Sequence, residues 1–123
     1  MSEAQFILTT SSGREIFDPS DVDLRVALEH VLAASTSEAA STAFDEHPNA
    51  WVRLVQGSGE MLILEVYRNG SMLFEKWGDT SYQRAISAPQ RLDRVALDQA
   101  LRLWRFLRAE DLDALRCEAW RPD

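Results

Sequence analysis

Hydrophobic and polar residues alternate most regularly between residues 51 and 77. Alternation with a period of two is typical of a strand that is buried on one side. Gly57-Ser58-Gly59 and Asn69-Gly70 interrupt this stretch. A three-residue loop at the first interruption pairs Val52 with Leu64 and keeps the apolar residues on one face, whereas Asn-Gly is typical of a two-residue hairpin turn. The pattern therefore predicts a three-stranded antiparallel meander.

These two turns also predict which side chains share a face of the meander. The first face is expected to be apolar, apart from Glu75, and to pack against helices; it carries Val52, Leu54, Leu62, Leu64, Val66, Leu73 and Trp77. The second face mixes aromatic and charged residues and carries Trp51, Arg53, Val55, Met61, Ile63, Glu65, Tyr67, Met72, Phe74 and Lys76. Glu65 and Lys76 are expected to be diagonal neighbours across the hairpin. This face is either covered by the terminal segments or available to a partner.

Apolar residues recur at helical spacing in two other segments. Residues 21–34 follow Ser20, which can cap a helix, and open with Asp21 and Asp23, which suit the positive end of the helix dipole. Residues 93–108 form the second predicted helix. Its apolar stripe consists of Val95, Ala96, Ala100, Leu103, Trp104 and Leu107.

Shorter segments complete the prediction. We expect strands at 6–9 and 14–17, a linker within the domain at 33–43, a loop or short strand at 80–86, a helical turn at 110–115 and a final strand at 116–120. A chain of 123 residues can bury one core of useful size. We therefore expect a single α+β domain over residues 1–123: an antiparallel sheet of four to six strands with two main helices packed on one face.

Charge is distributed unevenly along the chain. The formal net charge is −7. All of it belongs to residues 1–50, which contain nine acidic residues and two arginines, because the remainder contains eleven acidic and eleven basic residues. A negative field of this kind repels nucleic acid and anionic membranes and attracts basic proteins. It also aids solubility.

Targeting signals and cysteine usage favour a cytoplasmic protein. Cys117 is the only cysteine, so an intramolecular disulfide cannot form, and its alternating apolar surroundings predict a buried side chain. The N-terminus has no basic region, and Phe6-Ile7-Leu8 is too short for the apolar part of a signal peptide. No apolar run approaches the roughly 20 residues that cross a bilayer.

Residues with catalytic or metal-binding chemistry are sparse. His30 and His47 lie 17 positions apart without neighbouring cysteines, so we expect neither a metal site nor a cofactor. Gly57-Ser58-Gly59 is explained by a hairpin rather than by a phosphate loop. Acidic pairs such as Asp45 with Glu46 belong to loops, where nothing indicates the burial that tunes a carboxylate for acid–base chemistry. We therefore expect no catalytic residues and a protein that acts by binding another protein.

The C-terminal segment resembles that of a bacterial protein class. It runs from Ala96-Leu97-Asp98-Gln99-Ala100-Leu101 through Trp104-Arg105-Phe106-Leu107 to Arg116-Cys117-Glu118-Ala119-Trp120. With the order of elements before it, this is similar to the small immunity proteins that neutralise polymorphic toxins delivered between competing bacterial cells. The chain differs at the corner, where Ala109-Glu110-Asp111 replaces an expected Gly and Pro. The resemblance implies an acidic cytoplasmic protein that occludes the active site of a cognate toxin.

The residues expected to contact such a toxin follow from its chemistry. Nuclease and deaminase toxins need a basic surface, which acidic side chains can engage and aromatic side chains can anchor. The expected acidic contacts are Glu29, Asp45, Glu46 and Asp79, and the expected anchors are Trp51, Trp77 and Tyr82. Core packing is the alternative role for the tryptophans.

Two other functional classes remain open at this stage. An acidic secretion chaperone, or another protein-interaction module, would also be small and α+β. Such chaperones usually open with a helix, whereas this chain is expected to open with a strand. An enzyme or a small-ligand sensor would require a pocket, which the sequence pattern does not reveal.

Overall fold

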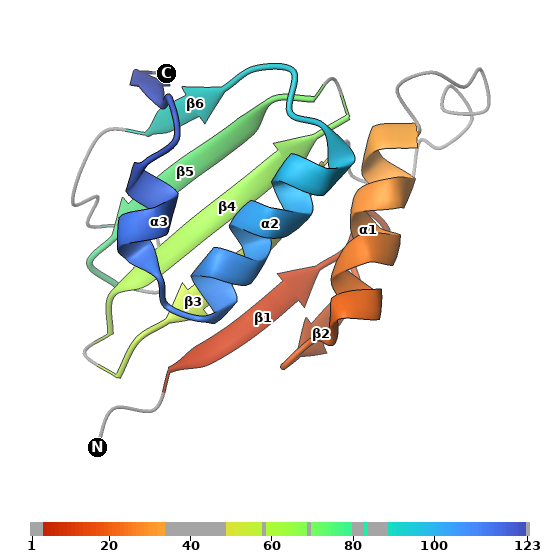
Figure 1. Ribbon diagram of the computed structural model, residues 1–123. Coiled ribbons are helices and arrows are strands. Elements are labelled where there is room, and N and C mark those ends of the chain that lie inside the picture. The colour runs from red at the N-terminus through yellow and green to blue at the C-terminus, as the bar shows by residue number, and fades with distance from the viewer. Residues whose placement is uncertain are drawn as a thin grey trace.

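The computed structural model describes residues 4–33, 49–57, 59–68, 70–79, 83 and 89–122. Within them the chain forms an α+β fold in which three helices cover one face of a seven-stranded antiparallel sheet (Figure 1). The strand order is β2-β1-β3-β4-β5-β6-β7. The elements are β1 Gln5–Thr9, β2 Glu15–Phe17, α1 Asp21–Ala33, β3 Asn49–Val55, β4 Met61–Tyr67, β5 Met72–Trp77, β6 Gln90–Leu92, α2 Leu97–Arg108, α3 Leu112–Arg116 and β7 Arg121–Pro122. The predicted class is confirmed, with more strands than the expected four to six.

The core lies between the helices and the face of the sheet that they cover, called here the helix face. β3 and β4 contribute the apolar set predicted for the first face: Val52, Leu54, Leu62, Leu64 and Val66. The two long helices contribute Leu24, Ala27, Leu28 and Val31 from α1 and Ala100, Leu101, Leu103, Trp104 and Leu107 from α2. These side chains form one cluster, as the helical and strand periodicities predict.

The start of α1 is stabilised by local and distant contacts. The Ser20 hydroxyl accepts a hydrogen bond from the Asp23 N–H at 3.2 Å, and the Ser20 N–H donates to the Asp23 carboxylate at 3.0 Å. This reciprocal capping confirms the predicted role of Ser20. Asp21 Oδ1 lies 2.6 Å from an Arg108 nitrogen and 3.3 Å from Arg105 Nε. Asp21 therefore joins the start of α1 to the last turn of α2.

The hairpin between β4 and β5 turns over three residues rather than the predicted two. The Tyr67 N–H donates to the Ser71 carbonyl at 2.8 Å, the Gly70 N–H donates to the Tyr67 carbonyl at 2.9 Å, and Gly70 has φ of 89°. A three-residue loop that ends in a left-handed glycine is a common alternative to the two-residue turn, and Asn-Gly suits both. The β3–β4 loop follows the same scheme at Gly59, with φ of 96°, so the three-residue prediction there is confirmed.

This extra loop residue reverses the predicted faces of β5, because a shift of one residue moves every side chain to the other side. Met72 lies opposite Val66, so Met72, Phe74 and Lys76 are on the helix face. Leu73, Glu75 and Trp77 are on the opposite face, and the prediction that placed Leu73 and Trp77 in the core is wrong. The predicted Glu65–Lys76 pair is wrong too, since Lys76 instead lies over the Phe74 ring with its Nζ 5.8 Å from the ring centroid.

The segments around α2 also differ from the prediction. Residues 90–92 form β6 and α2 begins at Leu97, so Ala96 is exposed rather than part of the buried stripe. The predicted strand at 116–120 is replaced by the end of α3 and a turn, in which the Trp120 indole N–H donates to the Leu115 carbonyl at 2.7 Å. Cys117 consequently caps α3 and is exposed. The predicted linker 33–43 and loop 80–86 lie outside the described residues, apart from Ala33 and Gln83.

Candidate interaction surface

The face of the sheet opposite the three helices is called here the outer face. Strand register assigns to it alternate residues of six strands: Gln5, Ile7, Thr9, Glu15, Phe17, Asn49, Trp51, Arg53, Val55, Met61, Ile63, Glu65, Tyr67, Leu73, Glu75, Trp77 and Arg91. In their described parts the terminal segments do not cover this face. β1 and β2 extend the sheet beside β3, whereas β7 extends it beside β6.

Apolar and aromatic side chains occupy much of the outer face. Ile7, Met61 and Ile63 are buried. Trp51 and Trp77 are half-buried, and each makes further interactions within the chain. Both indoles thus combine ordered packing with partial accessibility, which is the usual condition of an aromatic anchor in a protein interface.

Glu65 is the most strongly perturbed carboxylate on the outer face. The Tyr67 hydroxyl donates to Glu65 Oε1 at 2.8 Å, and the Asn49 amide donates to Glu65 Oε2. Burial raises the pKa of Glu65, and the negative charge of Glu75 raises it further, although the two hydrogen bonds act in the opposite direction. The effect of burial on the pKa of Glu65 is therefore larger than that of the two hydrogen bonds.

Glu75 completes an acidic pair with Glu65. It lies opposite Ile63 on β4 and is thus a diagonal neighbour of Glu65. The Trp77 indole N–H donates to Glu75 Oε1 at 3.2 Å, which ties one anchor to the pair. Arg53 is committed elsewhere, with Nη2 3.0 Å from Glu15. Arg91, which lies opposite Leu73 and so diagonal to Glu75, is paired with Asp93 at 3.0 Å. Neither glutamate forms a salt bridge within the described residues, so the two carboxylates leave negative charge at the centre of the outer face.

The structure brings two of the predicted contact residues to one surface. Trp51 lies opposite Glu65, which lies opposite Leu73, and Trp77 follows four residues further along β5. The two tryptophans are separated by two inter-strand spacings across the sheet and by four residues along it, so their backbones lie about 16 Å apart. Trp51 and Trp77 therefore flank the acidic pair, whereas the prediction placed them on opposite faces.

The predicted acidic contacts do not join them. Glu29 lies on α1, on the helix side of the sheet, 3.9 Å from Arg25. Asp79 follows β5 and accepts a hydrogen bond from the Gln83 N–H at 3.1 Å. Asp45, Glu46 and Tyr82 lie outside the described residues.

Glu65 and Glu75 are not among the contact residues predicted from the sequence. One signal could have revealed them. With a two-residue turn, Glu75 was the single charged residue on an otherwise apolar face. Moving the register by one residue transfers Glu75 to the face of Glu65, where its charge is compatible with solvent or a partner.

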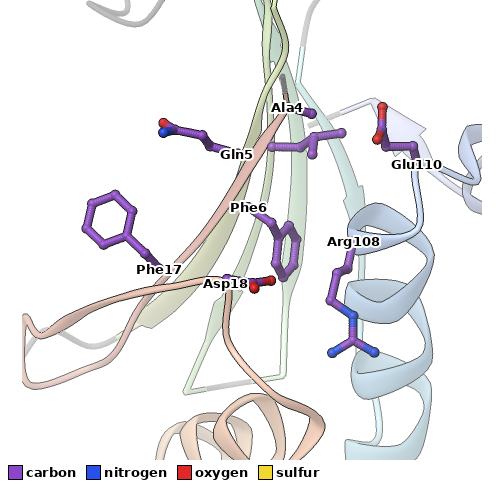
Figure 2. Close-up of a pocket in the computed structure, with 8 residues that line it drawn as sticks. Ala4, Gln5, Phe6, Phe17, Asp18, Arg108 and Glu110 are labelled. Carbon is purple, nitrogen blue, oxygen red and sulfur yellow. The ribbon is translucent and has the colours of Figure 1, made fainter. Parts of the chain in front are cut away.

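A hollow of about 390 Å³ lies between the start of β1, the end of β2 and the last turn of α2 (Figure 2). It is lined by Ala4, Gln5, Phe6, Phe17, Asp18, Leu54, Arg108 and Glu110. Figure 2 shows the Phe6 ring between Asp18 and Arg108. Phe17 lies on the outer-face side of the sheet and is 60% exposed. Gln5 and Phe17 also belong to the outer face, so the hollow adjoins it.

Negative charge prevails around this hollow. Arg108 is held by Asp21 and by the Pro19 carbonyl, at 3.4 Å. Asp18 and Glu110 form no salt bridge within the described residues, and both have positive φ, 52° and 60°, which is uncommon for residues other than glycine. The rim of the hollow could thus accommodate a basic side chain above an apolar floor.

In the described portion of the chain, His, Cys, Asp and Glu side chains form no group of three or more that could hold a metal ion. None of the helices described has the length and apolar character needed to cross a bilayer. No protein-family model, curated protein or solved structure matches the chain.

Proposed function

We propose that this protein is an immunity protein that binds a cognate secreted bacterial toxin in the cytoplasm and occludes its active site. The observation that carries the proposal is the outer face, where Glu65 and Glu75 form an acidic centre between two half-buried tryptophans. The resemblance of the C-terminal segment to immunity proteins supports the same role. The proposal assigns no reaction, no cofactor, and no nucleic-acid or membrane ligand to the chain.

The composition of the outer face suits a basic protein partner. Aromatic residues near the centre of an interface provide much of its binding energy, and complementary charge accelerates association. Toxins that act on nucleic acids carry basic active-site clefts, which an acidic surface can fill. An arginine or lysine of the partner placed between Glu65 and Glu75 would relieve their mutual repulsion and replace their lost hydration. The acidic rim of the adjoining hollow extends the same complementarity.

The Glu65–Glu75 pair also resembles what acid–base catalysis requires, namely two carboxylates of which one has a raised pKa. Enzymes place such groups in a cleft that surrounds the substrate. Neither glutamate lines the hollow of Figure 2, and both are held in place on the outer face, Glu65 by hydrogen bonds from Tyr67 and Asn49 and Glu75 by one from Trp77. The arrangement therefore favours protein recognition over catalysis.

The test is to express the toxin-like gene adjacent to this one with the wild-type protein and with two matched variants. Glu75→Lys reverses a charge at the centre of the outer face, and Glu29→Lys makes the same reversal on the helix side. We expect the wild type to protect cells and to form a complex. Glu75→Lys should weaken the complex by about tenfold or more, mainly through slower association at low salt, while Glu29→Lys should behave as the wild type.

Other results would redirect the assignment. If the wild type neither protects cells nor forms a complex, the immunity proposal is lost. A complex that keeps the partner competent for secretion without blocking its toxicity would favour the secretion-chaperone alternative. If Glu75→Lys binds as tightly as the wild type at low salt, the outer face is not the interface. A larger effect from Glu29→Lys, or from joint reversal of Asp45 and Glu46, would indicate that the interface lies within residues 1–50, which carry the net negative charge.

A further inference from the structure

A second hollow, of about 300 Å³, lies at the β5–β6 edge of the helix face, beside α3. It is called here the aromatic groove and is lined by Phe74, Lys76, Gln90, Arg116, Glu118 and Trp120. β5 supplies Phe74 and Lys76, β6 supplies Gln90, and the end of α3 with the following turn supplies the others. It lies on the opposite side of the sheet from Glu65 and Glu75.

Two ordered aromatic rings form the apolar part of the groove. The centroids of Phe74 and Trp120 are 5.3 Å apart, with the rings inclined at 41°. The hydrogen bond from the Trp120 indole N–H to the Leu115 carbonyl fixes the indole and satisfies its donor. Phe74 itself is 4% exposed, so a flat apolar group would pack here mainly on the half-buried Trp120, whose donor is already satisfied.

Lys76 supplies an available positive charge. Its Nζ lies 5.8 Å from the Phe74 ring centroid, within cation–π range. Lys76 has no salt bridge to any carboxylate of the described residues. The ammonium group lies over the Phe74 ring and helps to cover it, so an anion bound to Lys76 would lie beside the Phe74–Trp120 pair.

The remaining charges leave the groove net positive. Arg116 Nη1 lies 3.3 Å from Asp113, but the Asp113 side chain is 96% exposed, so this pair is weak. Glu118 is occupied, because the Gln99 amide donates to it at 3.0 Å and Arg102 lies 3.8 Å away. Two cations, Lys76 and Arg116, therefore remain to receive an anion.

We propose that the aromatic groove binds a small aromatic carboxylate. Its ring would pack on the half-buried Trp120, which Phe74 supports from below, and its carboxylate would accept hydrogen bonds from Lys76 and Arg116. The volume matches the lower end of small-molecule sites, which suits one or two fused rings. Glu118 lies in the same lining and would repel a second acidic group, so the site favours monoacids. This inference does not depend on the proposed toxin partner.

The experiment titrates ¹⁵N-labelled protein with 2-naphthoate and with its neutral analogue 2-naphthamide, and follows the Trp120 indole N–H resonance. Three variants are compared with the wild type: Lys76→Met and Arg116→Met remove cations from the groove, and Arg25→Met removes one from the exposed side of α1. We expect 2-naphthoate to shift the Trp120 signal. Lys76→Met and Arg116→Met should each weaken binding by about fivefold or more, and Arg25→Met should leave it unchanged.

Several outcomes would overturn the assignment. The first is a Trp120 resonance that does not shift at millimolar 2-naphthoate. The second is equal affinity for 2-naphthoate and 2-naphthamide. The third is a loss of affinity in Arg25→Met as large as that in Lys76→Met or Arg116→Met. The position of the unbound Trp120 resonance reports whether each variant keeps the Trp120–Leu115 hydrogen bond. If Lys76→Met disturbs this hydrogen bond, the affinity of Arg116→Met for 2-naphthoate becomes the deciding measurement, because Arg116 lies on α3 rather than on β5.

Discussion

Glu75 lies on the same face of the sheet as Glu65, diagonally across β4 and β5. Like charges at this distance, about 7–8 Å between diagonal positions, repel one another where burial has removed solvent screening. The hydrogen bonds from Tyr67 and Asn49 to Glu65, and from Trp77 to Glu75, offset part of that cost. An acidic pair kept in this arrangement is suited to a partner that supplies positive charge.

Glu65 should make stability depend on pH in a characteristic direction. Its pKa is raised above the usual 4.5, so between these two values the folded state binds more protons than the unfolded state. The free energy of unfolding should therefore fall as pH rises from about 4.5 through the folded pKa, and then level off. Glu65→Gln should remove this contribution. Tyr67→Phe should enlarge it, because the Tyr67 hydrogen bond lowers that pKa. Urea unfolding from pH 4 to 8 measures the effect, and parallel curves for wild type and Glu65→Gln would contradict it.

Asp21 should show the opposite dependence. Its hydrogen bond to Arg108, and the charges of Arg108 and Arg105, hold its pKa below the usual 3.8 despite some desolvation. The stability that it contributes is present above pH 3.8 and is lost as pH falls through the folded pKa. Asp21→Asn should thus be less stable than the wild type at pH 7, with a difference that shrinks in high salt and at pH 2.

The control for Asp21 is Asp113→Asn, which removes a pair confined to the short helix α3. Its effect at pH 7 should be smaller, because Asp21 joins two helices that are distant in sequence. Thermal unfolding at two salt concentrations compares the variants. Equal losses would mean that the α1–α2 contact adds nothing beyond a local surface pair.

Alanine substitutions at Leu64 and Leu103 test whether the core lies between the sheet and the helices. Both are fully buried, Leu64 on β4 and Leu103 on α2. Replacing either with alanine should cost about 2–5 kcal/mol of stability through lost transfer energy and the cavity that remains. Val22→Ala on α1, where Val22 is 69% exposed, should change stability by no more than about 0.5 kcal/mol. Chemical denaturation measures all three, and similar losses throughout would refute the assignment.

Gly59 and Gly70 form a matched test of the two three-residue loops. Both have positive φ, 96° and 89°, so alanine at either position should cost roughly 1–2 kcal/mol through backbone strain. A Cβ at Gly59 meets nothing within 4 Å, and one at Gly70 would lie 3.5 Å from Arg94 Cα, an ordinary contact. The two losses in unfolding free energy should therefore be nearly equal. A much larger loss for Gly70→Ala would show that the 94–95 segment tolerates no added atom.

The sequence by itself determined the features that depend on neighbouring residues. Ser20 and Asp23 define the start of α1 because their capping bonds span three positions. The alternation in β3 and β4, with the Gly57-Ser58-Gly59 loop, determined that Val52 faces Leu64, because a one-residue shift would place Arg53 beside the core residues. The α+β class follows from these local periods.

The tertiary structure decided what depends on distant parts of the chain. Asn69-Gly70 is compatible with two loop lengths, and packing of Met72 and Phe74 under the helices selects the longer one. That choice brings Glu75 and Trp77 to the face of Glu65 and Trp51. The Asp21–Arg108 contact joins positions 87 residues apart, and both hollows combine side chains from separate elements. Local sequence patterns do not specify such contacts, because packing of the core determines which strands and helices become neighbours.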